Sequence, residues 1–146
     1  MLVEYWNFKG FGNHQIMDVS EKAFQLGEWK ITDDWLNDYL IAVSDAGVEY
    51  SKFGMVPPVA ISSLVIGALL EKLELPSGTI HSLQEIETIS PALIGDLLRV
   101  SAVIGQTRQR GNLKFVTVDY RVNNAVGEEV QIGRSTVLVP HEAGVE

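Results

Sequence analysis

The chain has 146 residues, of which 46% are apolar and 21% charged, a composition that predicts one folded domain spanning residues 1–146 and argues against a disordered tail. It contains no cysteine, which excludes disulfides, thiolate metal sites, iron–sulfur clusters and a cysteine nucleophile. The formal net charge of −8 argues against a nucleic-acid partner, because phosphate contacts need clustered cations.

The sequence carries no recognisable targeting or membrane segment. Residues 1–10 include Glu4 and Lys9 and have no apolar stretch of signal-peptide length. The longest apolar stretch, residues 56–70, is interrupted by prolines and serines and is too short to cross a bilayer. We therefore expect a cytoplasmic protein without a membrane partner.

The first regular elements are a strand over residues 24–31 and a helix that follows it. Thr32 is a good N-cap, and two aspartates after it suit the positive end of the helix dipole. Apolar residues then recur at helical spacing over 35–43, and the helix should end near Ser44. Residues 45–56 show no periodicity, and we expect a loop there.

The next element is a second helix over residues 59–73. Proline suits the first helical turn, where its missing N–H would be unpaired, and Pro57 and Pro58 stand at that place. The following residues are apolar nearly all round, which predicts a helix buried on every face. Ser62, Ser63, Gly67 and Ala68 are small, so we expect another element to pack close to this helix.

The second half changes to strand periodicity. Strands are predicted over residues 79–90, 97–106, 113–123 and 129–139, as a meander with hairpin tips at 111–112 and 125–127. One fully buried helix and one long antiparallel sheet fit together most simply when the sheet curls around the helix. The fold class expected is therefore α+β, with the hot-dog architecture.

Several segments, in order, resemble the MaoC-like hydratase/dehydratase family, and most closely its fatty-acid-synthase-type dehydratase branch, often the N-terminal half of a double hot dog. The similarity runs from about residue 31 to residue 139. Its segments are 44–50 (SDAGVEY), 56–60 (VPPVA), 75–85 (LPSGTIHSLQE), 91–97 (PALIGDL) and 133–136 (GRST). The resemblance implies a single hot-dog domain over residues 1–146 that binds acyl thioesters.

The chain departs from the family at its D-x-N-P-I-H motif. Asp45 stands at the acid position, but Gly47 and Val48 replace the asparagine and proline, and Tyr50 stands at the histidine position. Asp45 is the acid/base candidate, although it could equally cap a helix end or pair with Lys52. A phenol loses its proton only near pH 10, so Tyr50 suits a wall or hydrogen-bond donor better than a base.

Hydration of a 2-enoyl thioester also needs donors that hold the thioester oxygen as it becomes enolate-like. The start of the 59–73 helix offers backbone N–H groups and a favourable dipole. Pro58 belongs to this turn but cannot donate, so Val59 and Ala60 are the expected donors. The alternative is that loop groups satisfy these amides.

His81 is a further catalytic candidate, because the resemblance also places a histidine early in this strand, although a structural histidine is the plainer interpretation. His14 and His141 lie near the ends in polar surroundings, and we expect both to be solvated. Three scattered histidines do not form a metal site. We expect neither a metal nor a cofactor.

Two functional hypotheses follow with near-equal weight. In one, the chain is a hydratase–dehydratase acting on acyl-CoA or acyl-carrier-protein thioesters. In the other, it is a non-catalytic substrate-binding subunit beside a histidine-bearing hot-dog chain. A hot-dog thioesterase is weaker, because residues 59–70 lack the carboxylate that such enzymes usually carry on the helix. A homodimer or heterodimer is expected in either case. The sequence does not indicate acyl chain length or a role for residues 1–30.

Overall fold

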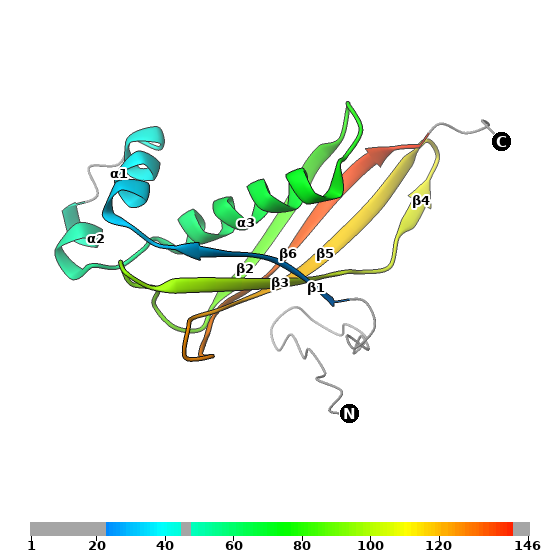
Figure 1. Cartoon of the computed structure of the whole chain (residues 1–146). Coiled ribbons are helices and arrows are strands. Elements are labelled where there is room, and N and C mark those ends of the chain that lie inside the picture. Colours follow the sequence, from blue (N-terminus) through cyan, green and yellow to red (C-terminus); the bar gives the residue numbers. More distant parts are fainter. Residues whose placement is uncertain (1–22, 45–47, 142–146) are drawn as a thin grey trace, which may run out of the picture.

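The computed structural model describes residues 23–44 and 48–141, which form one antiparallel sheet and three helices (Figure 1). The strands are β1 (Ala23–Lys30), β2 (Ile80–Thr88), β3 (Leu97–Ile104), β4 (Arg108–Arg110), β5 (Leu113–Asn123) and β6 (Glu129–Pro140). The helices are α1 (Asp33–Ala42), α2 (Val48–Phe53) and α3 (Pro58–Leu73).

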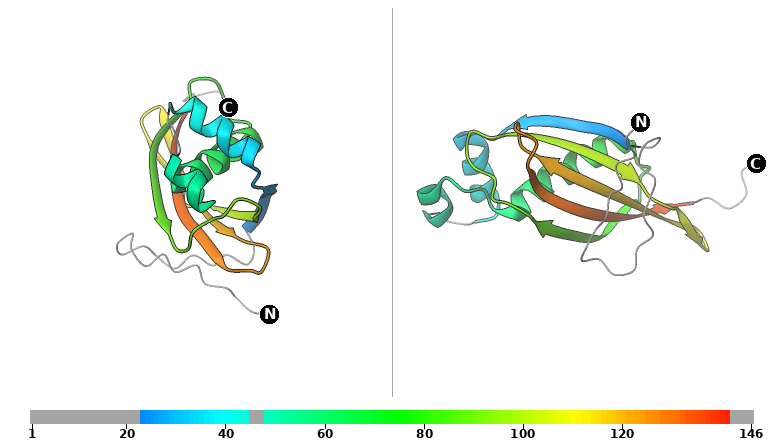
Figure 2. Two further views of the ribbon diagram at one scale, coloured as in Figure 1. Left: turned by 90° about the vertical axis from the view of Figure 1, so that its left-hand side faces the viewer. Right: turned by 90° about the horizontal axis from the view of Figure 1, so that it is seen from below.

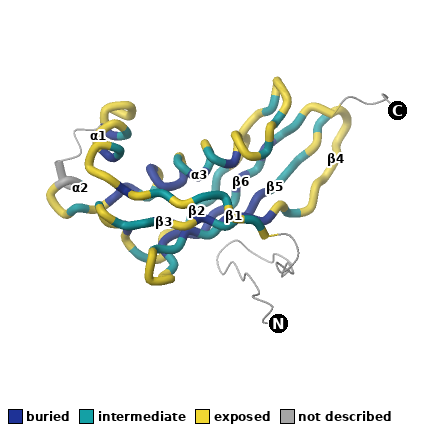
Figure 3. Tube along the Cα trace, viewed as in Figure 1, coloured by how far each residue is buried: buried dark blue, intermediate teal, exposed yellow. Residues whose placement is uncertain are grey.

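The sheet curves around α3, as the view along that helix shows (Figure 2), and this confirms the predicted fold class. One face of α3 packs on the concave side of the sheet through Ala60, Ile61, Val65 and Leu69. The sheet contributes inward-facing residues of its central strands to this core, among them Leu98, Val100, Ala102, Val118 and Val122. The buried residues of α3 and of the central strands lie where the helix and the sheet meet (Figure 3).

The local sequence signals for the start of α1, for both ends of α3 and for the hairpin tips are confirmed. The Thr32 hydroxyl accepts a hydrogen bond from the Trp35 amide at 3.2 Å and caps α1. Pro58 begins α3, and Glu74 ends it in the left-handed conformation at φ 46°. The hairpin tips lie at the expected places, with Gly111 and Gly127 at positive φ.

Three sequence expectations are wrong. Residues 45–56 are not all loop, because α2 occupies Val48–Phe53. Helix α3 is not buried on every face, since the face away from the sheet leaves Val59 56% exposed and Leu70 40% exposed. The close packing expected at the small residues of α3 is found at Ser62, which is buried, but not at Gly67, where an added methyl group would meet no atom within 4 Å.

The strand order is also not the expected meander. It runs β1-β3-β5-β6-β2, with β4 paired to β5. After β2 the chain does not turn back on itself but crosses to the far side of β5 and β6, which places β2 beside β6. The crossover contains Ala92 and Ile94, whose backbones bond to the segment that precedes α3. Those hydrogen bonds hold the crossover against the segment before α3.

Candidate functional site

The start of α3 is held in place by the turn between β2 and β3. Within that turn the Asp96 carboxylate accepts a hydrogen bond from the Leu93 amide at 2.9 Å, and Gly95 takes φ 97°. Backbone bonds then tie the turn to the chain before α3 and before α1: Val56 N to Ala92 O at 2.9 Å, Ile94 N to Gly54 O at 2.8 Å, and Ile31 N to Asp96 O at 2.8 Å. The P-x-x-x-G-D segment therefore fixes where α3 begins.

The first turn of α3 has an unusual cap. Its N-cap is Pro57, which makes no side-chain capping bond. Since Pro58 has no N–H, the first backbone donor of the helix is the Val59 amide, followed by the Ala60 amide. The Ala60 amide donates to the Pro57 carbonyl at 3.0 Å, whereas no backbone acceptor for Val59 is found among the described residues. The expected oxyanion role stays a prediction, and it falls mainly to Val59.

The predicted acid/base pair is only partly visible. Asp45 lies outside the described residues, as does His14. Tyr50 is half-buried on α2, and its carbonyl accepts a hydrogen bond from the Met55 amide at 3.0 Å. Helix α2 leads directly through Met55 into the start of α3, so Tyr50 and Val59 belong to the same end of the molecule (Figure 1). The catalytic roles of Asp45 and Tyr50 stay predictions.

His81 lies at the other end of α3. It is exposed near the beginning of β2, where it pairs with Val137 and its Nε2 lies 3.2 Å from Gln84 Oε1. The start of α3 is instead level with Thr88, seven residues further along β2, which corresponds to roughly 20 Å of strand. Within one chain, the structure therefore does not bring His81 to Tyr50 or Val59.

Sequence reasoning missed a buried polar network beneath α3. Gln131 and Tyr120 are both 0% exposed and lie on the concave face of the sheet. The Tyr120 hydroxyl donates to Gln131 Oε1 at 3.0 Å, and Gln131 Nε2 donates to the Pro58 carbonyl at 2.9 Å. Gln84 Nε2 donates to the Tyr120 oxygen at 3.1 Å, and the Ser135 hydroxyl donates to Gln84 Oε1 at 2.5 Å.

The network has a specific packing and electrostatic setting. Gly133 faces the Tyr120 ring so closely that an added Cβ would lie 2.3 Å from Tyr120 Cζ. Burial raises the pKa of the Tyr120 hydroxyl well above its ordinary value, an effect that the hydrogen bond with Gln84 only partly offsets. Tyr120 is therefore protonated throughout the neutral range, as its role as a donor requires.

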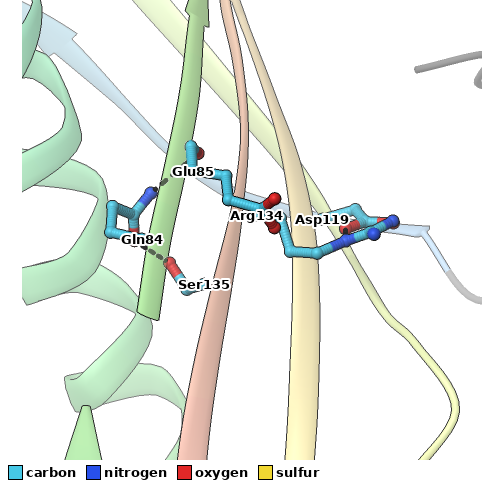
Figure 4. Close-up of polar contacts among 5 residues, drawn as sticks. All are labelled: Gln84, Glu85, Asp119, Arg134 and Ser135. Atoms are coloured by element: carbon cyan, nitrogen blue, oxygen red, sulfur yellow. Dashed lines mark hydrogen bonds and ion pairs between the residues drawn. The ribbon is translucent and has the colours of Figure 1, made fainter. Parts of the chain in front are cut away.

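Asp119 and Arg134 are sequence neighbours of network residues, but they point to the opposite face of the sheet and form an ion pair there (Figure 4). Arg134 donates from Nε and Nη2 to the two Asp119 carboxylate oxygens at 2.6 and 3.0 Å. This hydrogen bonding raises the pKa of the Arg134 guanidinium, and the nearby Glu85 carboxylate adds to the effect. Because Glu85, Arg134 and Asp119 stand opposite one another on β2, β6 and β5, the pair favours this strand register.

Among the described residues, no three histidine, aspartate or glutamate side chains gather in a way that could hold a metal ion. No described helix is both long enough and apolar enough to span a bilayer. His141 is exposed, as expected.

No protein-family model matches the sequence, and no curated protein matches it significantly. Solved structures do match its fold. A monoamine oxidase regulatory protein from Archaeoglobus has a TM-score of 0.70 at 18% identity, over 83% of this chain and 90% of that one. An (R)-hydratase from A. caviae involved in PHA biosynthesis has a TM-score of 0.67 at 16% identity, over 82% and 95%. The HadBC (3R-hydroxyacyl-ACP dehydratase) complex from Mycobacterium tuberculosis contributes a chain with a TM-score of 0.65 at 16% identity, over 80% and 93%.

These similarities confirm, at the level of the fold, the resemblance that the sequence motifs carry. The chain has the hot-dog fold that is found in MaoC-like dehydratases and (R)-hydratases. Identities of 16–18% leave activity and site residues to be argued from this chain itself.

Proposed function

We propose that the chain is a MaoC-like acyl-thioester-binding protein whose reaction is the reversible hydration of a 2-enoyl thioester of coenzyme A or acyl carrier protein. The observation that carries the proposal is the first turn of α3, which has no side-chain cap and is held by backbone hydrogen bonds in a fold that known hydratases share. The ordered motifs, including the Pro91–Asp96 turn that anchors this helix, support the same family and its fatty-acid-synthase-type branch.

The proposed chemistry divides into two parts. In the first, the Val59 amide holds the thioester oxygen, which carries the negative charge as the enolate forms, and the dipole of α3 adds to this stabilisation. In the second, Asp45 handles protons: water adds its oxygen to the β-carbon, water loses a proton, and the α-carbon gains one. Tyr50 lines the same end of the molecule as a wall or donor. The reverse sequence is the dehydration.

A second candidate function is a non-catalytic subunit that shapes the acyl site of a heteromeric dehydratase. Tyr50 at the family's histidine position favours it, because the chain then lacks the usual base. The similarity to a chain of the HadBC complex, a named heteromeric dehydratase, is consistent with such an assembly. The partner in this proposal is a histidine-bearing hot-dog chain, whereas the enzyme proposal needs only a homodimer.

The deciding experiment follows the loss of enoyl absorbance when the purified chain alone is mixed with a short-chain 2-enoyl-CoA, and then with a long-chain one. Asp45→Asn should abolish turnover, and the matched control Asp38→Asn, at an exposed position on α1, should leave it unchanged. Turnover that survives in Asp45→Asn would remove Asp45 from the mechanism.

Absence of turnover with every substrate, together with acyl-CoA binding by calorimetry, would favour the subunit. Light scattering then distinguishes the assemblies. A monomer at micromolar concentration would contradict the homodimer that the enzyme proposal expects.

A further inference from the structure

The buried network is costly unless it is complete. The core around it is apolar, and an amide or phenol buried there without a partner would cost on the order of 1–3 kcal/mol. Gln131 and Tyr120 are nevertheless fully buried, and each has its hydrogen bonds satisfied. A position that holds a polar group at this cost needs a reason beyond core packing.

The orientation of every group in the network follows from one acceptor. The Pro58 carbonyl can only accept, so the NH₂ of Gln131 faces it and the Gln131 oxygen faces Tyr120. The Tyr120 hydroxyl must then donate to Gln131, and its oxygen accepts from Gln84. Gln84 in turn presents its oxygen to Ser135. A flip of either amide would oppose two donors or two acceptors, so the network has one low-energy arrangement.

The network holds α3 from its carbonyl side. Helices are usually capped by a side-chain oxygen that accepts from the N–H groups of the first turn, and such a cap would occupy the donors that a thioester oxygen needs. Here Pro57 supplies no such oxygen. Among the described residues, the bond from Gln131 to Pro58 is the only side-chain hydrogen bond that joins α3 to the sheet.

We infer that Gln131 is a positioning residue, which fixes the first turn of α3 through the Pro58 carbonyl and so leaves the Val59 amide available to the substrate. Tyr120 and Gln84 act through Gln131 by holding its amide in the required orientation. This inference rests on the proposed function for its catalytic meaning, but the geometric part concerns the protein alone.

The test compares Gln131→Met, which keeps the side-chain length but removes the donor, with Gln109→Met, the same change at an exposed glutamine of β4. Gln131→Met should lower kcat for 2-enoyl-CoA hydration by about 10- to 100-fold, because small misplacement of a catalytic donor has effects of this size. KM should change less than threefold. Tyr120→Phe removes only one hydroxyl and should lower kcat by a smaller factor, which keeps the test available if Gln131→Met folds poorly.

Amide hydrogen exchange, measured by NMR on the same variants, gives a readout that needs no activity. The Ala60 amide, which donates to the Pro57 carbonyl, should exchange at least about tenfold faster in Gln131→Met, while the Leu69 amide near the other end of α3 should stay within about twofold. Wild-type kcat in both variants, or exchange that rises equally along the whole helix, would overturn the inference. If the wild type shows no hydration, the proposed function fails, and the exchange pattern still decides whether Gln131 positions the turn.

Discussion

Gly133→Ala is the most direct test of how the concave face is packed. Gly133 has no backbone need for glycine, since its φ is not positive, and it pairs with Tyr120 across β6 and β5. A Cβ at this position would lie 2.3 Å from Tyr120 Cζ and 2.4 Å from its hydroxyl oxygen. The ring is fully buried and bonded on both sides, so it cannot move away cheaply.

The expected cost can be built from its parts. Overpacking a core by one methyl group costs about 1–3 kcal/mol. Displacing the Tyr120 hydroxyl from Gln84 and Gln131 weakens two hydrogen bonds, each worth about 1 kcal/mol net. Replacing glycine by alanine in a strand returns about 0.5–1 kcal/mol of chain entropy. The free energy of unfolding should therefore fall by about 2–4 kcal/mol.

Urea denaturation with a double-mutant cycle measures this cost. In a Tyr120→Leu background the atoms that clash are absent, so Gly133→Ala should be within about 0.5 kcal/mol of neutral, a coupling of about 2–4 kcal/mol. Gly67→Ala on the open face of α3 is the matched control and should stabilise the protein by about 1 kcal/mol. The same cost for Gly133→Ala in both backgrounds would refute the close packing of Gly133 against the ring.

Three further outcomes can be checked by the same unfolding assay. Thr32→Ala removes the cap of α1 and should cost about 1 kcal/mol. Asp119→Ala breaks an ion pair whose side chains are 14% and 8% exposed and should cost about 2–3 kcal/mol, whereas Glu28→Ala, in a pair that is 52% and 51% exposed, should cost under about 1 kcal/mol; equal costs would contradict the difference in burial. Above pH 10.0 an unfolded tyrosine loses its proton while buried Tyr120 keeps it, so the unfolded state binds fewer protons and the free energy of unfolding falls by up to about 1.4 kcal/mol per pH unit. Tyr120→Phe should remove this part of the pH dependence. An unchanged pH profile in that variant would show that Tyr120 is not the group responsible.

Local signals in the sequence predict most of the secondary structure. A capping hydroxyl at Thr32, a proline at the first turn of α3 and glycines at hairpin tips each act over a few residues, and each appears where expected. The strand order could not be predicted in this way. The pairing of β2 with β6 depends on the crossover after β2, whose bonds connect residues such as Val56 and Ala92 that are distant in sequence.

The buried network was missed because the polar face of β6 points inward. Gln131 shares the concave face with Gly133 and Ser135 in unbroken alternation, whereas hydrophobicity alone would turn Val130 and Ile132 toward α3. The register shifts only beyond Gln131, where Asn123 pairs with Glu129 and Val130 is the extra residue. Alternation along β5 places Tyr120 on the same face as Val122, but it does not show which partner the Tyr120 hydroxyl finds.

The two halves of the proposed chemistry depend on different parts of the chain. Binding of the thioester oxygen relies on backbone at the start of α3, which the Pro91–Asp96 turn and Gln131 hold from two sides. Proton transfer is proposed to rely on Asp45, in the segment where the sequence resemblance puts Tyr50 at the family's histidine position. In the proposed family, a chain of this kind keeps the means to bind an acyl thioester even where it leaves proton transfer to a partner subunit.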